Sequence, residues 1–133
     1  MTLRGIRGAI TVYDDDPGQI LAATRELLDA LLRANPGLRT DEIASAIFTT
    51  TGDLVSTYPA LAARQMGWDL VPMMCGSEIP VPGGLPRCIR VLIHWNSERD
   101  QVDIHHVYLR EATKLRPDLS SASAEAKPKE KRP

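Results

Sequence analysis

An arginine interrupts an apolar segment in the second half of the chain, and it limits the folds that the chain can adopt. Arg90 lies within residues 88–93, where every other residue is cysteine, isoleucine, valine or leucine. Such a run is typical of a buried β-strand. A guanidinium stays charged in proteins, so desolvating it without a partner is very costly. A fold that buries this strand must therefore supply either an internal carboxylate or a site for an anionic ligand.

A second arginine, Arg7, interrupts the strand that we expect over residues 3–12. Because side chains alternate along a strand, Ile6, Ile10 and Val12 share one face and Arg7 lies on the other. A glycine and an alanine, two residues before and after Arg7, leave space around it. Two arginines within strands indicate a site for carboxylates or phosphates.

The clearest helix signal begins at Asp16. Asp16 is the expected N-cap, Pro17 the first helical residue, and residues 35–37 (Asn-Pro-Gly) the end of the helix. Between them, apolar residues recur at helical spacing. The expected buried stripe is Ile20, Thr24, Leu27, Leu28, Leu31 and Leu32.

Strands and helices alternate along the remaining chain, which predicts an α+β fold. The order β-α-β-α-β-β implies a mixed sheet with the helices on one face. We expect one domain over residues 1–119 and a disordered tail over 120–133, which has no large apolar residue. The further elements that we expect are a short helix capped by Thr40, strands at 46–50, 70–75 and 87–95, a helix from Pro59 to Gly67, and a strand or extended segment at 104–109.

Several classes of function fit the sequence poorly. The net charge is −1 and aromatic residues make up 5% of the chain, which disfavours nucleic-acid binding. There is no signal-peptide pattern, no apolar run long enough to span a membrane, and only two cysteines. We therefore expect a cytoplasmic protein without disulfides.

Cofactor and metal sites are also not indicated. His94, His105 and His106, with Cys75 and Cys88, lack the spacing of metal ligands, and adjacent histidines in an extended segment point to opposite sides. No nucleotide-binding glycine loop or nucleophile motif is present. We expect neither a metal nor another cofactor.

The remaining candidates are Arg7, Arg90, Arg64, Glu78 and Tyr108. From the residues alone two interpretations stay open. Arg90 can form a structural ion pair with Glu78 or with the aspartate at position 69, or these groups can bind an anion.

Several spaced segments together form a more specific pattern than any single motif. They are 4–12, 58–60 with Arg64, 67–68 with 71–72, Cys75 with Glu78, 88–91, 106–109 and 115–119. In this order they closely resemble the monofunctional chorismate mutases of the AroH class, over about residues 3–119. The resemblance implies a homotrimer that forms a pseudo-α/β barrel, with active sites between subunits. It also implies conversion of chorismate to prephenate, a step toward phenylalanine and tyrosine, by an intramolecular rearrangement without a nucleophile.

The resemblance also implies roles for the candidate residues. Arg90 stabilises the negative charge that grows on the ether oxygen and reaches a substrate carboxylate. Arg7 binds a carboxylate with help from Tyr108, and Glu78 accepts the ring hydroxyl, with Cys75 beside it as a weaker partner.

Further residues complete the implied pocket. Tyr58, Arg64, Met73 and Met74 line it from the neighbouring subunit, and Leu115 and Arg116 close it. Relatives in this class can carry phenylalanine, lysine and threonine where this chain has Tyr58, Leu61 and Met74. We expect these differences to change the affinity for substrate more than the activity. A different possibility is a trimeric small-carboxylate-binding protein of similar, YjgF-like architecture, because a fold alone does not fix a function.

Overall fold

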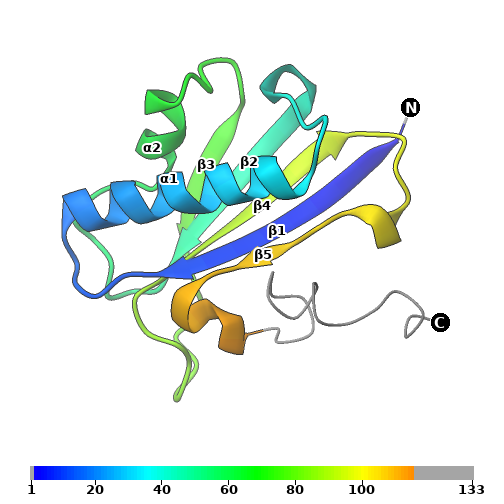
Figure 1. Cartoon of the computed structure of the whole chain (residues 1–133). Coiled ribbons are helices and arrows are strands. Elements are labelled where there is room, and N and C mark those ends of the chain that lie inside the picture. The colour runs from blue at the N-terminus through cyan, green and yellow to red at the C-terminus, as the bar shows by residue number, and fades with distance from the viewer. Residues whose placement is uncertain (1, 116–133) are drawn as a thin grey trace.

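A computed structural model describes residues 2–115, which form a five-stranded mixed sheet with two α-helices on one face (Figure 1). The strand order is β3-β2-β4-β1-β5; β4 is antiparallel to β2 and β1, whereas β3 is parallel to β2 and β5 to β1. This arrangement confirms the α+β class, the mixed sheet and the helices on one face. The elements are β1 (Leu3–Thr11), α1 (Pro17–Ala34), β2 (Ile43–Thr50), α2 (Ala60–Gln65), β3 (Met73–Ser77), β4 (Cys88–Asn96) and β5 (Val107–Tyr108), with 3-10 helices at Thr40–Glu42, Gln101–Asp103 and Arg110–Lys114.

The α1 helix begins as the sequence predicts. The Asp16 carboxylate accepts a hydrogen bond from the backbone N–H of Gln19 at 2.9 Å, and Pro17 is the first helical residue. Every residue of the expected stripe is buried except Leu32, which is half-buried. A Cβ atom added at Gly8 of β1 would lie 2.9 Å from Leu31 Cδ1, so this glycine allows α1 to pack closely on the sheet.

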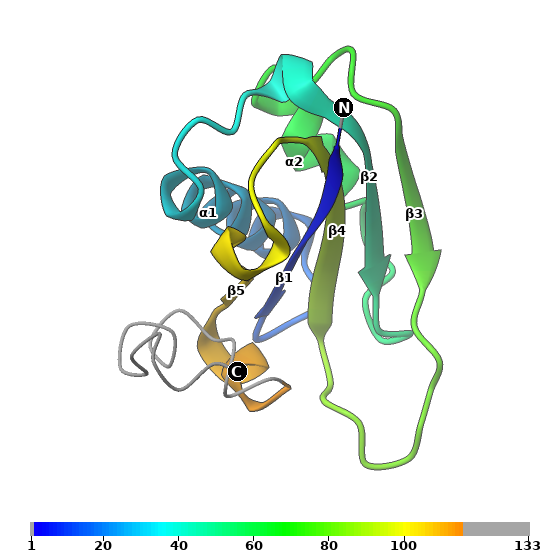
Figure 2. The ribbon, with the colours of Figure 1, turned by 90° about the vertical axis from the view of Figure 1, so that its right-hand side faces the viewer.

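Both helices lie on the same side of the sheet, as the side view shows (Figure 2). The main core forms there between α1, α2 and the inward-facing residues of β1, β2 and β4. The opposite face, here called the open face, is covered at one end by a second cluster. Its buried members are Ala9, Cys88, Tyr108 and Ala112.

Four expected elements differ clearly from those observed, and the fifth strand among them is described separately below. The third strand is Met73–Ser77 rather than 70–75, because the carbonyl of Pro72 starts the ladder by accepting from Ala46 N–H at 3.0 Å. Proline has no N–H to contribute to a strand interior. The second strand starts at Ile43, three residues before the expected start at 46, and its pairing with β4 shifts register between Ile43 and Ser45. Thr40 does not cap the short helix, since it is already its first residue.

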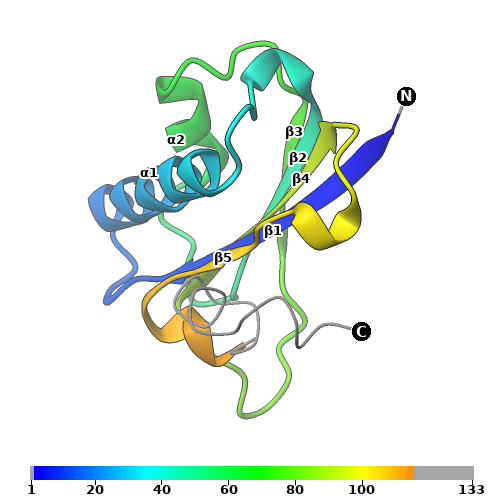
Figure 3. The ribbon, with the colours of Figure 1, turned by 45° about the vertical axis from the view of Figure 1, so that its right-hand side comes forward.

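The fifth strand has two residues instead of spanning 104–109. Just before it, the backbone of His105 is bound by the buried side chain of Asn35, which accepts from His105 N–H and donates to its carbonyl, both at 2.9 Å. These bonds use the polar groups that a longer strand would pair with β1. Figure 3 shows β5 beside β1, followed by the last 3-10 helix. The tail expected over 120–133 lies outside the described residues and stays a prediction.

Candidate functional site

The open face holds a pocket of about 250 Å³ at the middle of the sheet. Arg90 of β4 is paired in register with Ala9 of β1 on one side and Thr49 of β2 on the other. Residues directly opposite on paired strands point to the same face. The pocket is lined by Arg7, Gly8, Ala9, Ile47, Thr49, Glu78, Arg90, Val91, Leu92 and Tyr108, so it joins the four residues to which the resemblance assigns catalytic roles.

Arg90 has an incomplete set of partners within the chain. Its Nε lies 3.5 Å from Glu78 Oε2 in an ion pair, with side chains 37% and 25% exposed. That Nε atom is nevertheless buried without a hydrogen-bond partner among the described residues. The structure is therefore consistent with both interpretations left open by the sequence: a carboxylate of the chain lies near Arg90, and one donor of Arg90 has no hydrogen-bond partner among the described residues.

Glu78 is held at the end of β3 by two hydrogen bonds. Its backbone N–H donates to the carbonyl of Thr50 at 2.9 Å, continuing the ladder with β2. Its Oε2 accepts a hydrogen bond from the hydroxyl of Thr49. The backbone and one carboxylate oxygen are therefore fixed beside Arg90.

Arg7 and Tyr108 enter the pocket from β1 and β5. Arg7 is exposed, and within residues 2–115 its guanidinium has neither an ion pair nor a hydrogen bond. Its backbone N–H donates to Nδ1 of His106 at 3.0 Å, which joins β1 to the segment that carries Tyr108. Tyr108 is 2% exposed but lines the pocket, and its hydroxyl has no partner in the described part of the chain. Arg7 and Arg90 against Glu78 give the pocket an excess of one positive charge.

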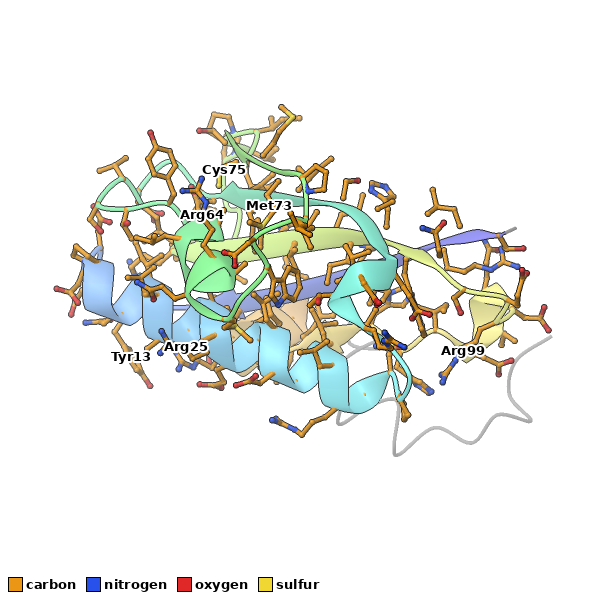
Figure 4. The ribbon with its side chains drawn as sticks, turned by 90° about the horizontal axis from the view of Figure 1, so that it is seen from above. Tyr13, Arg25, Arg64, Met73, Cys75 and Arg99 are labelled. Atoms are coloured by element: carbon orange, nitrogen blue, oxygen red, sulfur yellow. The ribbon has the colours of Figure 1, made fainter. Side chains whose placement is uncertain are left out.

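The residues expected from a neighbouring subunit line a separate pocket, also of about 250 Å³, between α2 and β3. It contains Tyr58, Arg64, Met73, Met74 and Cys75. Figure 4 shows Arg64 of α2 close to Met73 and Cys75 of β3.

Within one chain, Cys75 and Glu78 line different pockets, and the contact between them that the resemblance implies stays a prediction. Cys75 pairs in register with Phe48, a core residue, so its side chain is on the helix side of β3. Glu78 lines the pocket on the open face instead. Cys75 and Glu78 thus lie on opposite faces of the edge strand β3.

The loop that leads to Tyr58 is tied down by Asp15. Its Oδ1 accepts from the backbone N–H groups of Val55 and Ser56, each at 3.0 Å. The Ser56 side chain and these N–H groups lower the pKa of the Asp15 carboxyl below its ordinary value, although partial desolvation opposes the shift.

Cys88 lies behind Arg90 in the second cluster. Burial raises the pKa of its thiol to about 11, and the nearby Arg90 only partly offsets this effect. A thiol with such a pKa is not a nucleophile near neutral pH. Leu115 packs against the same cluster, and Arg116 lies outside the described residues.

The described residues contain no group of three or more histidine, cysteine, aspartate or glutamate side chains placed to hold a metal ion. None of the helices among them is long and apolar enough to cross a membrane.

Thr49, Ile47 and Leu92 line the first pocket but were not singled out from the sequence. Alternation places Leu92 on the face of Arg90, so that residue could have been found by its position. Thr49 and Ile47 lie on β2, and only the pairing of β2 with β4 brings them to the pocket.

Known proteins that are similar to this chain are chorismate mutases. The family model for chorismate mutase type I matches residues 3–119. The chorismate mutase AroH of Thermus thermophilus is 57% identical over 120 residues, covering 90% of this chain and 98% of the relative. The chorismate mutase AroH of Bacillus subtilis is 40% identical over 121 residues, covering 90% and 94%.

A solved structure also matches. A chorismate mutase from Clostridium thermocellum superposes with a TM-score of 0.81 at 50% identity, covering 84% of this chain and 98% of that one. These comparisons do not support the alternative of a non-catalytic, YjgF-like binding protein. The chain belongs to the type I chorismate mutase family.

Proposed function

We propose that the chain converts chorismate to prephenate in aromatic amino-acid biosynthesis, with the pocket around Arg90 as the main part of its active site. The observation that carries this proposal is Arg90, which lines a pocket together with a second arginine and whose buried Nε has no hydrogen-bond partner among the described residues. The reaction breaks an ether C–O bond within one molecule and needs no nucleophile. A fixed positive charge beside the ether oxygen is the help that it requires.

Arg90 stabilises the growing negative charge on that oxygen. Its guanidinium is held on β4 between two paired strands, so it needs little reorganisation as the charge develops. Arg7 binds a substrate carboxylate, and the Tyr108 hydroxyl, which has no partner within residues 2–115, donates to the same end. Glu78 accepts the ring hydroxyl and faces the ring, which becomes partly positive. Together these contacts select the compact conformer in which the reacting carbons are close.

We further propose that the site is completed by a neighbouring subunit in a homotrimer. Ile47 and Met74 are 39% and 71% exposed on and beside the open face, although both are apolar. The second pocket, with Tyr58 and Arg64, opens on the other side of β3. A second subunit that supplied this second group across the first pocket would cover both surfaces. The cytoplasmic location expected from the sequence stays a prediction.

The activity is tested by following chorismate's ultraviolet absorbance after adding the purified protein. Loss of absorbance with formation of prephenate supports the proposal, and the Arg90→Ala variant should be nearly inactive. A wild-type protein that binds chorismate without consuming it at micromolar enzyme would instead be a binding protein.

The shared site is tested by mixing two inactive variants, Arg90→Ala and Arg64→Ala, after dissociation and reassembly. If each site joins the first pocket of one subunit to the second pocket of its neighbour, random reassembly restores about a quarter of the wild-type sites. A site contained within one chain would give no recovery. Light scattering on the wild-type protein should report three subunits.

A further inference from the structure

Thr49 of β2 is the only described residue whose side chain hydrogen-bonds to Glu78. Its hydroxyl donates to Glu78 Oε2, the same oxygen that lies 3.5 Å from Arg90 Nε. Thr49 is also paired in register with Arg90, so the two side chains share the open face. The residue thus lies between the two charged groups of the pocket.

This contact fixes the direction of the Glu78 carboxylate. The backbone of Glu78 is bound to the carbonyl of Thr50 at 2.9 Å, and Oε2 is bound to Thr49. The other oxygen, Oε1, accepts no hydrogen bond within residues 2–115. With one oxygen fixed, the other keeps a defined position from which to accept a hydrogen bond. A carboxylate without this tether would rotate about its last side-chain bonds, and its unoccupied oxygen would not stay in place.

We propose that Thr49 is a positioning residue that acts through Glu78. By holding Oε2, it keeps Glu78 Oε1 in place to accept a hydrogen bond from the hydroxyl of the bound substrate. The inference rests on the proposed function, because it assumes that Glu78 contacts substrate. A hydrogen bond to an ionised carboxylate is stronger than one between neutral groups, so its loss is measurable.

The competing explanation is that threonine is present only because it favours a strand. Two substitutions separate these roles. Thr49→Val keeps the shape and the strand preference but removes the hydroxyl, whereas Thr49→Ser keeps the hydroxyl. If Thr49 positions Glu78, Thr49→Val lowers kcat by about tenfold to a hundredfold, and Thr49→Ser stays within about threefold of wild type.

The split between kcat and KM is part of the test. Binding of the negatively charged substrate depends on the charges of Arg7 and Arg90. The KM of Thr49→Val should therefore change much less than its kcat. The melting temperature should stay within about 3 °C of wild type. Thr49→Ala, which also lacks the hydroxyl, is the second variant if Thr49→Val folds poorly. The matched control is Thr50→Val, the next residue on β2, whose hydroxyl donates to the Leu54 carbonyl at 3.4 Å and whose register partner is Ile89 of the core.

A double-mutant cycle with Glu78→Ala tests whether Thr49 acts through Glu78. In that background Thr49→Val should cause no further loss, because the carboxylate that it positions is gone. Additive losses, or a Thr49→Val variant with wild-type kcat, would overturn the inference while leaving the mutase assignment intact. An inactive wild-type protein would overturn the proposed function itself.

Discussion

Replacing Arg90 by methionine should separate activity from stability. Methionine keeps an unbranched stem of similar reach, so packing beside Cys88 is retained while the guanidinium is removed. Removing one preorganised donor from a developing oxyanion costs about 3–4 kcal/mol, and here a carboxylate contact is lost as well. We therefore expect kcat/KM to fall by roughly a thousandfold or more.

The expected effect on folding has the opposite sign. The ion pair with Glu78 joins side chains that are 37% and 25% exposed. Losing such a pair costs at most about 1 kcal/mol. Removing a buried donor without a hydrogen-bond partner returns about 1–3 kcal/mol. The free energy of unfolding should therefore stay the same or rise by up to about 3 kcal/mol.

The assay is chorismate consumption across substrate concentrations, together with thermal and urea unfolding at matched protein concentration. Arg33→Met, which removes an exposed charge from α1 far from the pocket, is the control and should retain activity. A loss of activity below tenfold would refute the role of Arg90 at the ether oxygen. A drop of more than about 2 kcal/mol in the free energy of unfolding would show that Arg90 makes stabilising contacts in the folded chain.

Three further predictions concern the scaffold. Gly8→Ala should lower the free energy of unfolding by about 1–3 kcal/mol through overpacking against α1. Gly5→Ala, whose added Cβ would lie 3.6 Å from its nearest neighbour, should be nearly neutral; equal effects would contradict the close approach at Gly8. Iodoacetamide at pH 8.5 should leave the buried Cys88 unmodified in native protein, and an adduct on Cys88 in mass spectrometry would refute its burial. Because the pKa of Asp15 is lowered in the folded state, its ionised form stabilises the fold above the ordinary aspartate pKa of about 3.9. Wild type should therefore have a higher free energy of unfolding than Asp15→Asn near neutral pH, and this difference should disappear as the pH falls through the lowered pKa of Asp15. A difference that stays constant down to pH 2 would contradict this prediction.

Local patterns predicted the elements whose signals lie within the segment itself. The cap at Asp16 and the apolar stripe located α1, and alternation placed Arg90 on the face opposite the core. The bounds of β5 were not accessible in this way. They depend on Asn35, which binds the backbone of a residue seventy positions away. No periodicity reports such a bond.

The site could be predicted in the same partial way. Resemblance brought Arg90 and Glu78 to one pocket, but not Thr49, because a threonine in a strand has no distinctive pattern. Within one chain, Cys75 and Glu78 are separated by the alternation of the strand, and their proximity in an assembled site stays a prediction. Residues three apart in an extended chain point to opposite faces, and the expected strand bounds of 70–75 hid this relation. With the strand at Met73–Ser77, the alternation places Cys75 on the other face of the sheet.

The position of β4 at the centre of the sheet has a consequence for motion. The backbone of Arg90 can be displaced only if bonds to strands on both sides break, which amounts to opening the whole domain. Tyr108 lies on a two-residue strand at one margin, and Glu78 follows the strand at the other margin. Local opening at an edge of the sheet breaks only a few hydrogen bonds. Tyr108 and Glu78, which are proposed to bind the substrate, can therefore move while the backbone that carries Arg90 stays in place. Arg90 is thus anchored at the centre of the sheet, whereas the edge strands that flank the pocket can open locally as substrate enters and product leaves.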